Sequence, residues 1–205
     1  MESSRLLQGD LEGSCFTRGA YHDWYRARRF VADLLCTSGP VLDIGCANGY
    51  LLECLQLWSG LSIVPYGLDI RADAIAAARS RFPDHAGRFL CADARSLEAQ
   101  KWFRMLPVAS LVYWNLPSDW DLAEPGVQVW IAQVLGSVRA DAIGLGVYGK
   151  NALAASGEQR AHEREQIRLR CHQLRSLLGD GEVVLNPNGS AHALLALAQR
   201  LPGRQ

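Results

Sequence analysis

VLDIGCANGYLLE, residues 41–53, is the stretch that decides the fold of this chain. It begins with an apolar run that contains Asp43, passes through Gly45 and Gly49, and ends in a leucine-rich segment. This pattern predicts a strand, a tight loop and a helix. The two glycines let the backbone turn sharply and leave no side chain between the loop and a ligand, and the first N–H groups of the helix face that ligand. We therefore expect a loop that binds a nucleotide or a nucleoside cofactor, with Asp43 placed to hold a cationic or hydroxyl-bearing group.

The spacing of the glycines narrows the class of cofactor. A dinucleotide fingerprint requires G-x-G-x-x-G, but counted from Gly45 its second and third glycine positions hold Ala47 and Tyr50. A phosphate-binding P-loop requires Gly-Lys-Ser/Thr, which this stretch lacks. The alternative is a generic turn with no ligand, since glycine turns between strands and helices are common.

A second acidic residue follows the next predicted strand. Asp69 lies 20 residues after Gly49, at the end of Tyr66-Gly67-Leu68-Asp69-Ile70. At this separation a second-strand carboxylate reaches the ribose of a bound nucleoside, and a carboxylate can accept hydrogen bonds from both cis hydroxyls. An acid after a strand can also be a plain helix N-cap, and an alanine-rich helix is predicted immediately after it.

Two further predicted strands end in polar residues. Residues 88–92 lead into Asp93 and Ala94, and residues 108–114 lead into Asn115-Leu116-Pro117. In an open α/β sheet, ligands bind at the edge formed by the carboxyl ends of the strands. The repetition across four strands therefore predicts one ligand site at that edge.

The segment 43–49 resembles motif I of the class I S-adenosylmethionine-dependent methyltransferases, acidic-x-Gly-x-Gly-x-Gly. Asp43, Gly45 and Gly49 match the motif, and Ala47 stands where the middle glycine is expected. The resemblance covers roughly residues 38 to 198 and implies S-adenosylmethionine as cofactor. Its acidic residue after the second strand would bind the ribose, and its acidic residue after the third strand would bind the adenine amino group. The implied cofactor-binding residues are Asp43, Gly45, Cys46, Ala47, Asn48, Gly49, Asp69, Ile70, Asp93, Ala94 and Asn115.

The expected fold is an α/β, doubly wound, mostly parallel seven-stranded sheet with an antiparallel C-terminal hairpin and helices on both faces. Alternating strands and helices predict right-handed parallel crossovers, and Asn188-Gly189 between two apolar runs predicts the hairpin turn. A helix over 190–200 is the alternative, because alanine and leucine favour helix. Strands are predicted over 41–45, 62–68, 88–92, 108–114, 141–148, 181–186 and 191–198, and helices over 21–36, 49–58, 71–80, 96–105, 125–139 and 151–178.

Methyl transfer from a sulfonium is an in-line displacement, so the enzyme mainly has to align a nucleophile with the methyl carbon. A base is needed only where the nucleophile must lose a proton. The catalytic candidates are Asn115, whose setting resembles the Asn-Pro-Pro-Tyr motif of amino-group methyltransferases, and His22 on the predicted N-terminal helix. Aromatic residues suit an apolar or cationic acceptor, although each can equally be a core residue. The acceptor-binding candidates are Tyr21, Trp24, Tyr25, Trp114, Trp120 and Tyr148.

Length and composition favour a single domain of 205 residues, with an N-terminal arm and lid helix over 1–37 and a cofactor-binding domain over 38–205. The six cysteines form no C-x-x-C pair and no zinc-binding pattern, so we expect no metal and free thiols in the cytoplasm. Cys46 lies in the cofactor loop, where it is either reactive or simply packed. No run approaches the length of a membrane span.

The leading functional hypothesis is methyl transfer to a small molecule. A formal net charge of zero gives no electrostatic argument for a nucleic-acid or membrane-surface protein. RNA methylation is an alternative, and a cofactor-binding partner protein without turnover is another, since a fold alone does not fix a function. A nicotinamide oxidoreductase is disfavoured by the missing glycines. The arginines that could contact RNA, or form an ion-paired helix face, are Arg26, Arg28, Arg29, Arg160, Arg164, Arg168 and Arg175.

Overall fold

A computed structural model of the chain describes residues 21–148, 157–178, 182–185 and 191–197. The predicted N-terminal arm before residue 21 lies outside the described residues, as does the predicted Asn188-Gly189 turn. The first part of the helix expected over 151–178 also lies outside them, and the described part begins at Gly157.

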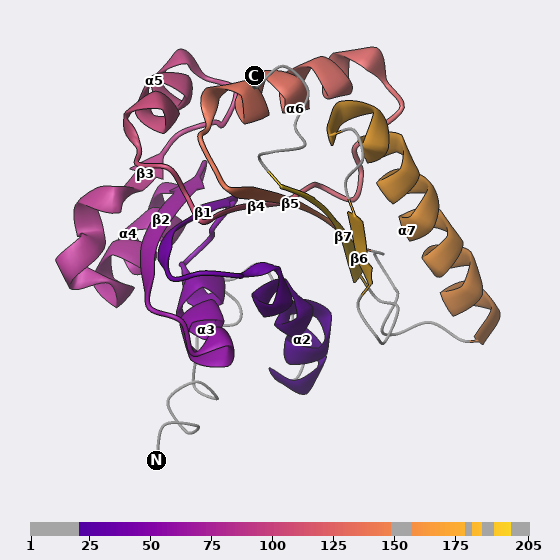
Figure 1. Cartoon of the computed structure of the whole chain (residues 1–205), viewed down its shortest axis with the longest axis horizontal. Coiled ribbons are helices and arrows are strands. Elements are labelled where there is room, and N and C mark those ends of the chain that lie inside the picture. The colour runs from indigo at the N-terminus through magenta and orange to yellow at the C-terminus, as the bar shows by residue number, and fades with distance from the viewer. Residues whose placement is uncertain (1–20, 149–156, 179–181, 186–190, 198–205) are drawn as a thin grey trace.

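One sheet organises the molecule, in the strand order β3-β2-β1-β4-β5-β7-β6 (Figure 1). The first five strands run parallel, while β7 runs antiparallel to both of its neighbours, β5 and β6. The order reverses between β1 and β4, which is the point where open α/β sheets bind ligands. The predicted α/β architecture with a parallel sheet is confirmed. The strands are β1 (Gly39–Ile44), β2 (Ile63–Asp69), β3 (Phe89–Cys91), β4 (Leu111–Asn115), β5 (Ala142–Tyr148), β6 (Glu182–Leu185) and β7 (Ala191–Leu197).

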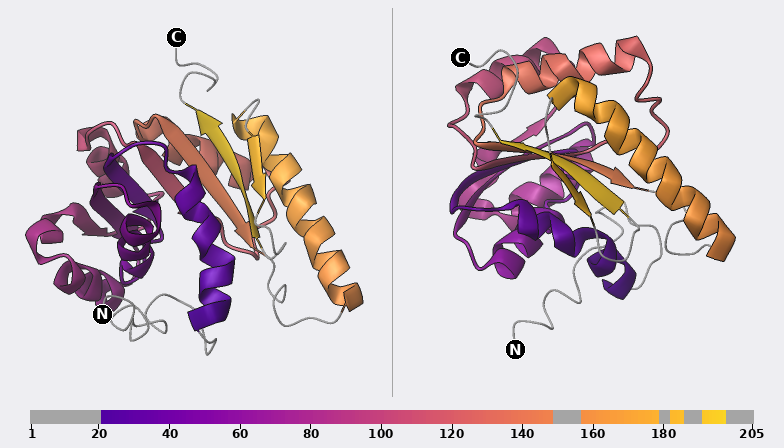
Figure 2. Two further views of the ribbon diagram at one scale, coloured as in Figure 1. Left: turned by 60° about the horizontal axis from the view of Figure 1, so that its bottom comes forward. Right: turned by 45° about the vertical axis from the view of Figure 1, so that its right-hand side comes forward.

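Helices cover both faces of this sheet (Figures 1 and 2). One face packs against α2, η1, α3 and α4, and the opposite face packs against α5, α6 and α7. Each face has its own hydrophobic core, because side chains of a strand alternate between the two faces. The helices are α2 (Tyr21–Arg28), η1 (Arg29–Leu34), α3 (Tyr50–Ser59), α4 (Ala72–Arg81), η2 (Pro83–Arg88), α5 (Leu97–Met105), α6 (Pro125–Ser137) and α7 (Gly157–Leu178).

The N-terminal helix differs from the prediction of one helix over 21–36. It is α-helical to Arg28 and then tightens into the 3-10 helix η1, which ends with Leu35 N–H donating to Ala32 O at 3.2 Å. The burial pattern accounts for this change: Phe30, Val31, Ala32 and Leu34 are all buried in the core, and the ion pair of Arg29 and Asp33 stays partly exposed. 3-10 turns are frequent at the ends of α-helices, and here the tighter winding runs from Arg29 to Leu34.

No helix among the described residues is both long enough and apolar enough to cross a membrane.

Candidate functional site

The polar strand ends predicted from the sequence lie along one edge of the sheet. The parallel register places Ile44 of β1 beside Leu68 of β2 and Trp114 of β4, and it places Asp69 beside Cys91 of β3. The residues that follow these positions therefore leave the sheet at nearly the same level. The structure brings together the carboxyl ends that carry Asp43, Asp69, Asp93 and Asn115.

The loop after β1 turns tightly against the end of β2. The backbone N–H groups of Gly45 and Cys46 both donate to Leu68 O, at 2.7 and 3.0 Å. Gly45 and Gly49 have φ angles of 82° and 73°, and Ala47 has a φ of 50°. Left-handed backbone is unusual for a residue with a Cβ. The loop keeps the shape of a glycine loop although its middle glycine is an alanine.

Asp69 joins this loop to the start of α4. Its Oδ2 accepts a hydrogen bond from Ala47 N–H at 2.8 Å, and its Oδ1 accepts one from Arg71 N–H at 3.0 Å. The residue is only 8% exposed. Oδ1 also lies 3.6 Å from Arg71 Nε. Since each carboxylate oxygen has two lone pairs, each oxygen still has a lone pair that is not used by the two backbone N–H groups. The carboxylate is thus both a structural clamp and a candidate partner for two neighbouring hydroxyl groups.

Asp43 is buried in β1 beneath the loop. Burial and the nearby negative charge of Asp69 raise the pKa of its carboxyl to about 7, while the positive charge of Arg28 acts in the opposite direction. A buried carboxyl with this pKa changes its charge close to neutral pH. A cationic ligand group beside it would favour the ionised form, so the position suits an ammonium group.

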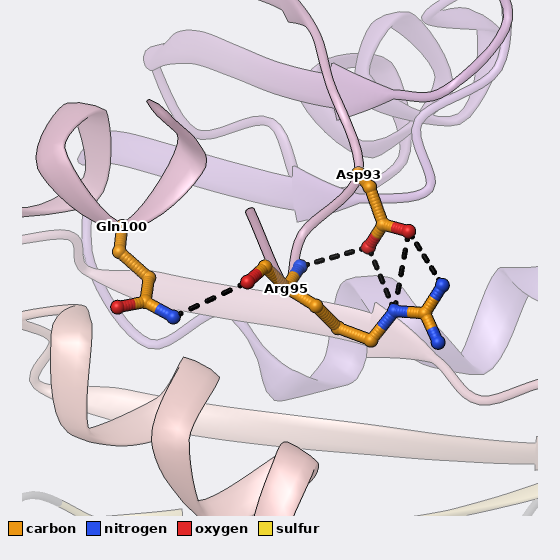
Figure 3. A network of polar contacts seen from close by, with 3 residues as sticks. All are labelled: Asp93, Arg95 and Gln100. Atoms are coloured by element: carbon orange, nitrogen blue, oxygen red, sulfur yellow. Dashed lines mark hydrogen bonds and ion pairs between the residues drawn. The ribbon is translucent and has the colours of Figure 1, made fainter. Parts of the chain in front are cut away.

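Asp93 is held by its neighbour Arg95 (Figure 3). The Arg95 backbone N–H donates to Asp93 Oδ1 at 2.8 Å, and the guanidinium donates to both carboxylate oxygens. This side-chain hydrogen bonding keeps the pKa of Asp93 below its usual value. The guanidinium also lies 4.9 Å from the ring centroid of Trp130 on α6. An adenine amino group bound by Asp93 would have to share this carboxylate with Arg95, which the sequence motif did not predict.

Asn115 ends β4 in a segment that is fixed from two sides. Leu116 N–H donates to Gly146 O at 3.0 Å, and Arg170 of α7 donates to Pro117 O at 2.6 Å. Asn115 Oδ1 itself is buried and has no hydrogen-bond partner among the described residues. A buried polar atom without a partner is costly, so this oxygen is a candidate acceptor for a ligand N–H or O–H group.

Among the described side chains, the predicted aromatic acceptor residues lie on both faces of the sheet and do not all line one pocket, which corrects the expectation from sequence. Trp24 is only 1% exposed and packs against Tyr50 and Trp58 of α3, so it is a core residue. Trp114 and Trp120 contact each other on the opposite face of the sheet. Strand alternation is the physical reason for Trp114, because it turns this side chain to the face opposite that of Tyr113, the preceding residue of β4.

The two other described aromatic candidates, Tyr25 and Tyr148, both lie on the α2 face of the sheet. Tyr25 packs edge-on against Trp58 at 5.4 Å. Tyr148 lies at the end of β5 on the α2 side, where it contacts Tyr113. The side chains of Tyr21 and His22 lie outside the part of the structure that is described.

Cys46 is a packed thiol rather than a reactive one. Its side chain is buried, and burial raises the pKa of the thiol well above its usual value. A Cβ placed on Gly67 of β2 would lie 2.6 Å from the Cys46 sulfur. The sulfur of Cys46 therefore fills the space that Gly67 leaves, which explains why position 67 has no side chain.

Two features of the site were missed from the sequence. Arg81 of α4 donates from Nε to Asn48 O at 3.0 Å and pairs with Glu53, so it ties the loop to α3. Tyr113 is fully buried and its hydroxyl lies 2.7 Å from that of Tyr148. No local signal predicts either contact, because the partners are 33 and 35 residues apart.

The comparisons with known proteins agree with this geometry. No protein-family model matches the chain, and no curated protein matches it in sequence. A SAM-dependent methyltransferase from Aquifex aeolicus matches in structure with a TM-score of 0.53 at 12% identity, over 84% of this chain and 91% of that one. The plantazolicin methyltransferase BpumL, solved with S-adenosylhomocysteine, matches with a TM-score of 0.53 at 14% identity, over 95% and 88%.

A third match is the Haloferax volcanii protein solved in complex with the Trm112 methyltransferase activator. Its TM-score is 0.57 at 12% identity, over 95% of this chain and 96% of that one. The chain therefore has the fold of class I SAM-dependent methyltransferases, as its loop motif predicted. At these identities the likeness shows the fold alone.

Proposed function

We propose that this protein is an S-adenosylmethionine-dependent methyltransferase that acts on a small-molecule acceptor. The observation that carries the proposal is the loop at residues 45–49, which is left-handed at three positions and hydrogen-bonded to Asp69 at the switch point of the sheet. Buried Asp43 lies directly below this loop. These parts are what a ligand with a ribose and an ammonium group requires.

Each part of the cofactor has a candidate partner in this chain. We assign the ribose hydroxyls to Asp69 and the α-ammonium group to Asp43. Ile70 is 70% exposed directly after Asp69, so it offers an apolar surface to the adenine ring. We assign the adenine amino group to Asp93, with Ala94 beside it. When bound, S-adenosylmethionine supplies a methyl group activated by its sulfonium centre.

Binding of S-adenosylhomocysteine tests the proposal. A ligand that binds only the native state stabilises it by RT ln(1 + [L]/Kd), which is about 2.7 kcal/mol at a hundredfold excess over Kd. We expect the melting temperature to rise with S-adenosylhomocysteine and to stay constant with NADH at the same concentrations, with calorimetry giving the Kd. The absence of any shift at millimolar S-adenosylhomocysteine would contradict the proposal.

Gly49→Ala tests whether the loop is the ligand site. An alanine at position 49 would have to keep a backbone φ of 73°, and its Cβ would lie 3.0 Å from the Phe82 ring. We expect a loss of about 1–2 kcal/mol in the free energy of unfolding and at least tenfold weaker binding of S-adenosylhomocysteine. Gly60→Ala is the matched control, because Gly60 has a φ of 68° at the far end of α3 with open space around it. The control should be destabilised by about 1 kcal/mol without a change in ligand affinity. Equal affinities of the two variants for S-adenosylhomocysteine would show that the loop is not part of the ligand site.

Asn115 is proposed to orient the acceptor, since its Oδ1 is buried without a partner among the described residues. An acceptor can be found by incubating the protein with methyl-labelled S-adenosylmethionine and a panel of small amines, phenols and acids. With that acceptor, Asn115→Ala should lower kcat/KM by about 100-fold, the loss expected of an oriented hydrogen bond. The Kd of S-adenosylhomocysteine should change less than threefold. Unchanged turnover would remove Asn115 from the chemistry.

RNA is a less well supported acceptor. Arg29 is paired with Asp33 at 2.9 Å, and Arg168 lies 3.9 Å from Glu165, so these cations are partly neutralised by their own helices. Arg28 lies over an aromatic ring of β5. Steep weakening of RNA binding with increasing salt would favour this alternative. A cofactor-binding protein without turnover would bind S-adenosylhomocysteine and methylate nothing in the panel.

A further inference from the structure

The C-terminal end of α2 places a cation over the same edge of the sheet that carries Asp43. The guanidinium carbon of Arg28 lies 3.7 Å from the centroid of the Tyr148 ring, at the end of β5. Arg28 is half-buried, and the ion pairs recorded among the described side chains do not include it. The side chain of Arg28 also hydrogen-bonds that of Tyr148, and the guanidinium, with five N–H donors, has others left for an anion.

Two tyrosines connect this cation to Asp43. The Tyr148 hydroxyl lies 2.7 Å from that of Tyr113. Tyr113 of β4 is paired in register with Asp43 of β1, so both side chains are on the α2 face of the sheet. A Cβ at Gly146 would collide with the Tyr113 hydroxyl, so β5 is shaped to let this ring reach Tyr148. The four residues form one continuous cluster beside the glycine loop.

The charges of this cluster are complementary to an amino acid. Asp43 presents a carboxyl group, and the positive charge of Arg28 is close enough to favour its ionised form. A free α-amino acid group carries an ammonium and a carboxylate on the same carbon. The carboxylate of Asp43 is complementary to the ligand's ammonium group, and the guanidinium of Arg28 is complementary to the ligand's carboxylate.

We propose that Arg28 of α2 binds the α-carboxylate of the cofactor's amino-acid portion, opposite Asp43 at its ammonium group. The inference rests on the proposed function and extends it, because it makes the N-terminal helix part of the cofactor site. Tyr148 supports the guanidinium from below through its ring, and Tyr113 holds Tyr148 in place. The planar guanidinium can bind the carboxylate through two parallel hydrogen bonds.

Two ligands that differ only in the amino-acid portion test this assignment. S-adenosylhomocysteine carries the ammonium and the carboxylate, whereas 5′-methylthioadenosine has the same adenosine and thioether but neither charge. We expect Arg28→Gln to weaken binding of S-adenosylhomocysteine by about 10- to 100-fold and to change the Kd of 5′-methylthioadenosine less than twofold, both by calorimetry. Arg29→Gln is the matched control on the adjacent position, and it should leave both affinities unchanged.

Arg28→Lys separates the effect of the positive charge from the effect of the guanidinium geometry. It keeps a cation but loses the planar fork, so it should recover part of the affinity for S-adenosylhomocysteine. Melting temperatures of all variants check that the cluster still folds. Equal weakening of both ligands in Arg28→Gln, or a change below twofold for S-adenosylhomocysteine, would overturn the assignment. If the wild-type chain binds neither ligand, the proposed function fails and this inference falls with it.

Discussion

Asp69→Ala is expected to weaken binding of S-adenosylhomocysteine by about 100-fold or more. The carboxylate accepts from Ala47 N–H at 2.8 Å and from Arg71 N–H at 3.0 Å, and it keeps acceptor positions for two ribose hydroxyls. Hydrogen bonds to a charged group contribute about 1.5–3 kcal/mol each, so losing two of them gives a factor of this size. Calorimetry at pH 8, where the carboxyl of Asp43 is ionised, measures the change.

The control for this variant is Asp73→Ala. Asp73 lies in the first turn of α4 and is exposed, so its removal changes the charge of the same helix without touching the loop. We expect its Kd to stay within twofold of the wild type. Asp69→Asn keeps one carbonyl acceptor and should fall between the wild type and the alanine variant. An Asp69→Ala protein that is folded and binds within threefold of the wild type would refute the role of this residue.

Asp43→Asn is expected to raise the free energy of unfolding at pH 8 and to lower the affinity for S-adenosylhomocysteine. Burial and Asp69 raise the pKa of the Asp43 carboxyl to about 7 from an ordinary value of 3.8. The native state therefore holds a proton that the unfolded chain releases between these two values. The stability that this proton gives is complete below pH 3.8 and is lost as the pH rises through 7. Above pH 7 the wild type contains a buried negative charge.

Asparagine has the shape of the neutral carboxyl and no charge to bury. The free energy of unfolding of Asp43→Asn should exceed that of the wild type by about 2–4 kcal/mol at pH 8. The difference should shrink steadily towards pH 4. Urea unfolding of both proteins at several pH values measures it. A difference that is the same at pH 4 and pH 8 would show that the carboxyl does not titrate in this range.

The same substitution should reduce the affinity for S-adenosylhomocysteine at pH 8 by about 10- to 100-fold, because the ligand ammonium loses a charged partner. In the wild type, binding should weaken below pH 7, by up to about tenfold per pH unit. The charged and titratable groups around Asp43 are Asp69, Arg28, Cys46, Tyr113 and Tyr148. Binding should release a proton at pH 6.5, which calorimetry detects as a dependence on the buffer's ionisation enthalpy. Its absence would place the ammonium elsewhere.

The fold could be predicted from the sequence because its signals are local. The run from Val41 to Glu53 contains the strand, the loop and the helix start within 13 residues, and the strand-end acids repeat the same pattern. Parallel strands then place these ends at one edge without further information. For the same reason, the residues assigned to the ribose and to the ammonium group follow directly from the sequence.

The rest of the site depends on contacts between distant elements. Sequence alone could not show that Arg95, two residues further on, binds both oxygens of Asp93, since the side chain could equally point into solvent. Nor could it show that Trp24 of α2 is buried against α3 while Trp114 faces the opposite core. Aromatic residues near a predicted site carry no signal for which face they occupy until the strand register and the helix positions are known. Arg28 was recognised only as a surface cation for the same reason.

The two borders of the sheet are its shortest described strands. β3 has three residues and β6 has four, and they lie at opposite ends of the strand order. A border strand exposes unpaired backbone N–H and C=O groups to which a strand of another molecule can add. With so few such groups on either side, the sheet gives a neighbouring polypeptide little to pair with. The longer strands β1, β4 and β5 are all interior, so each is paired with a strand on both sides.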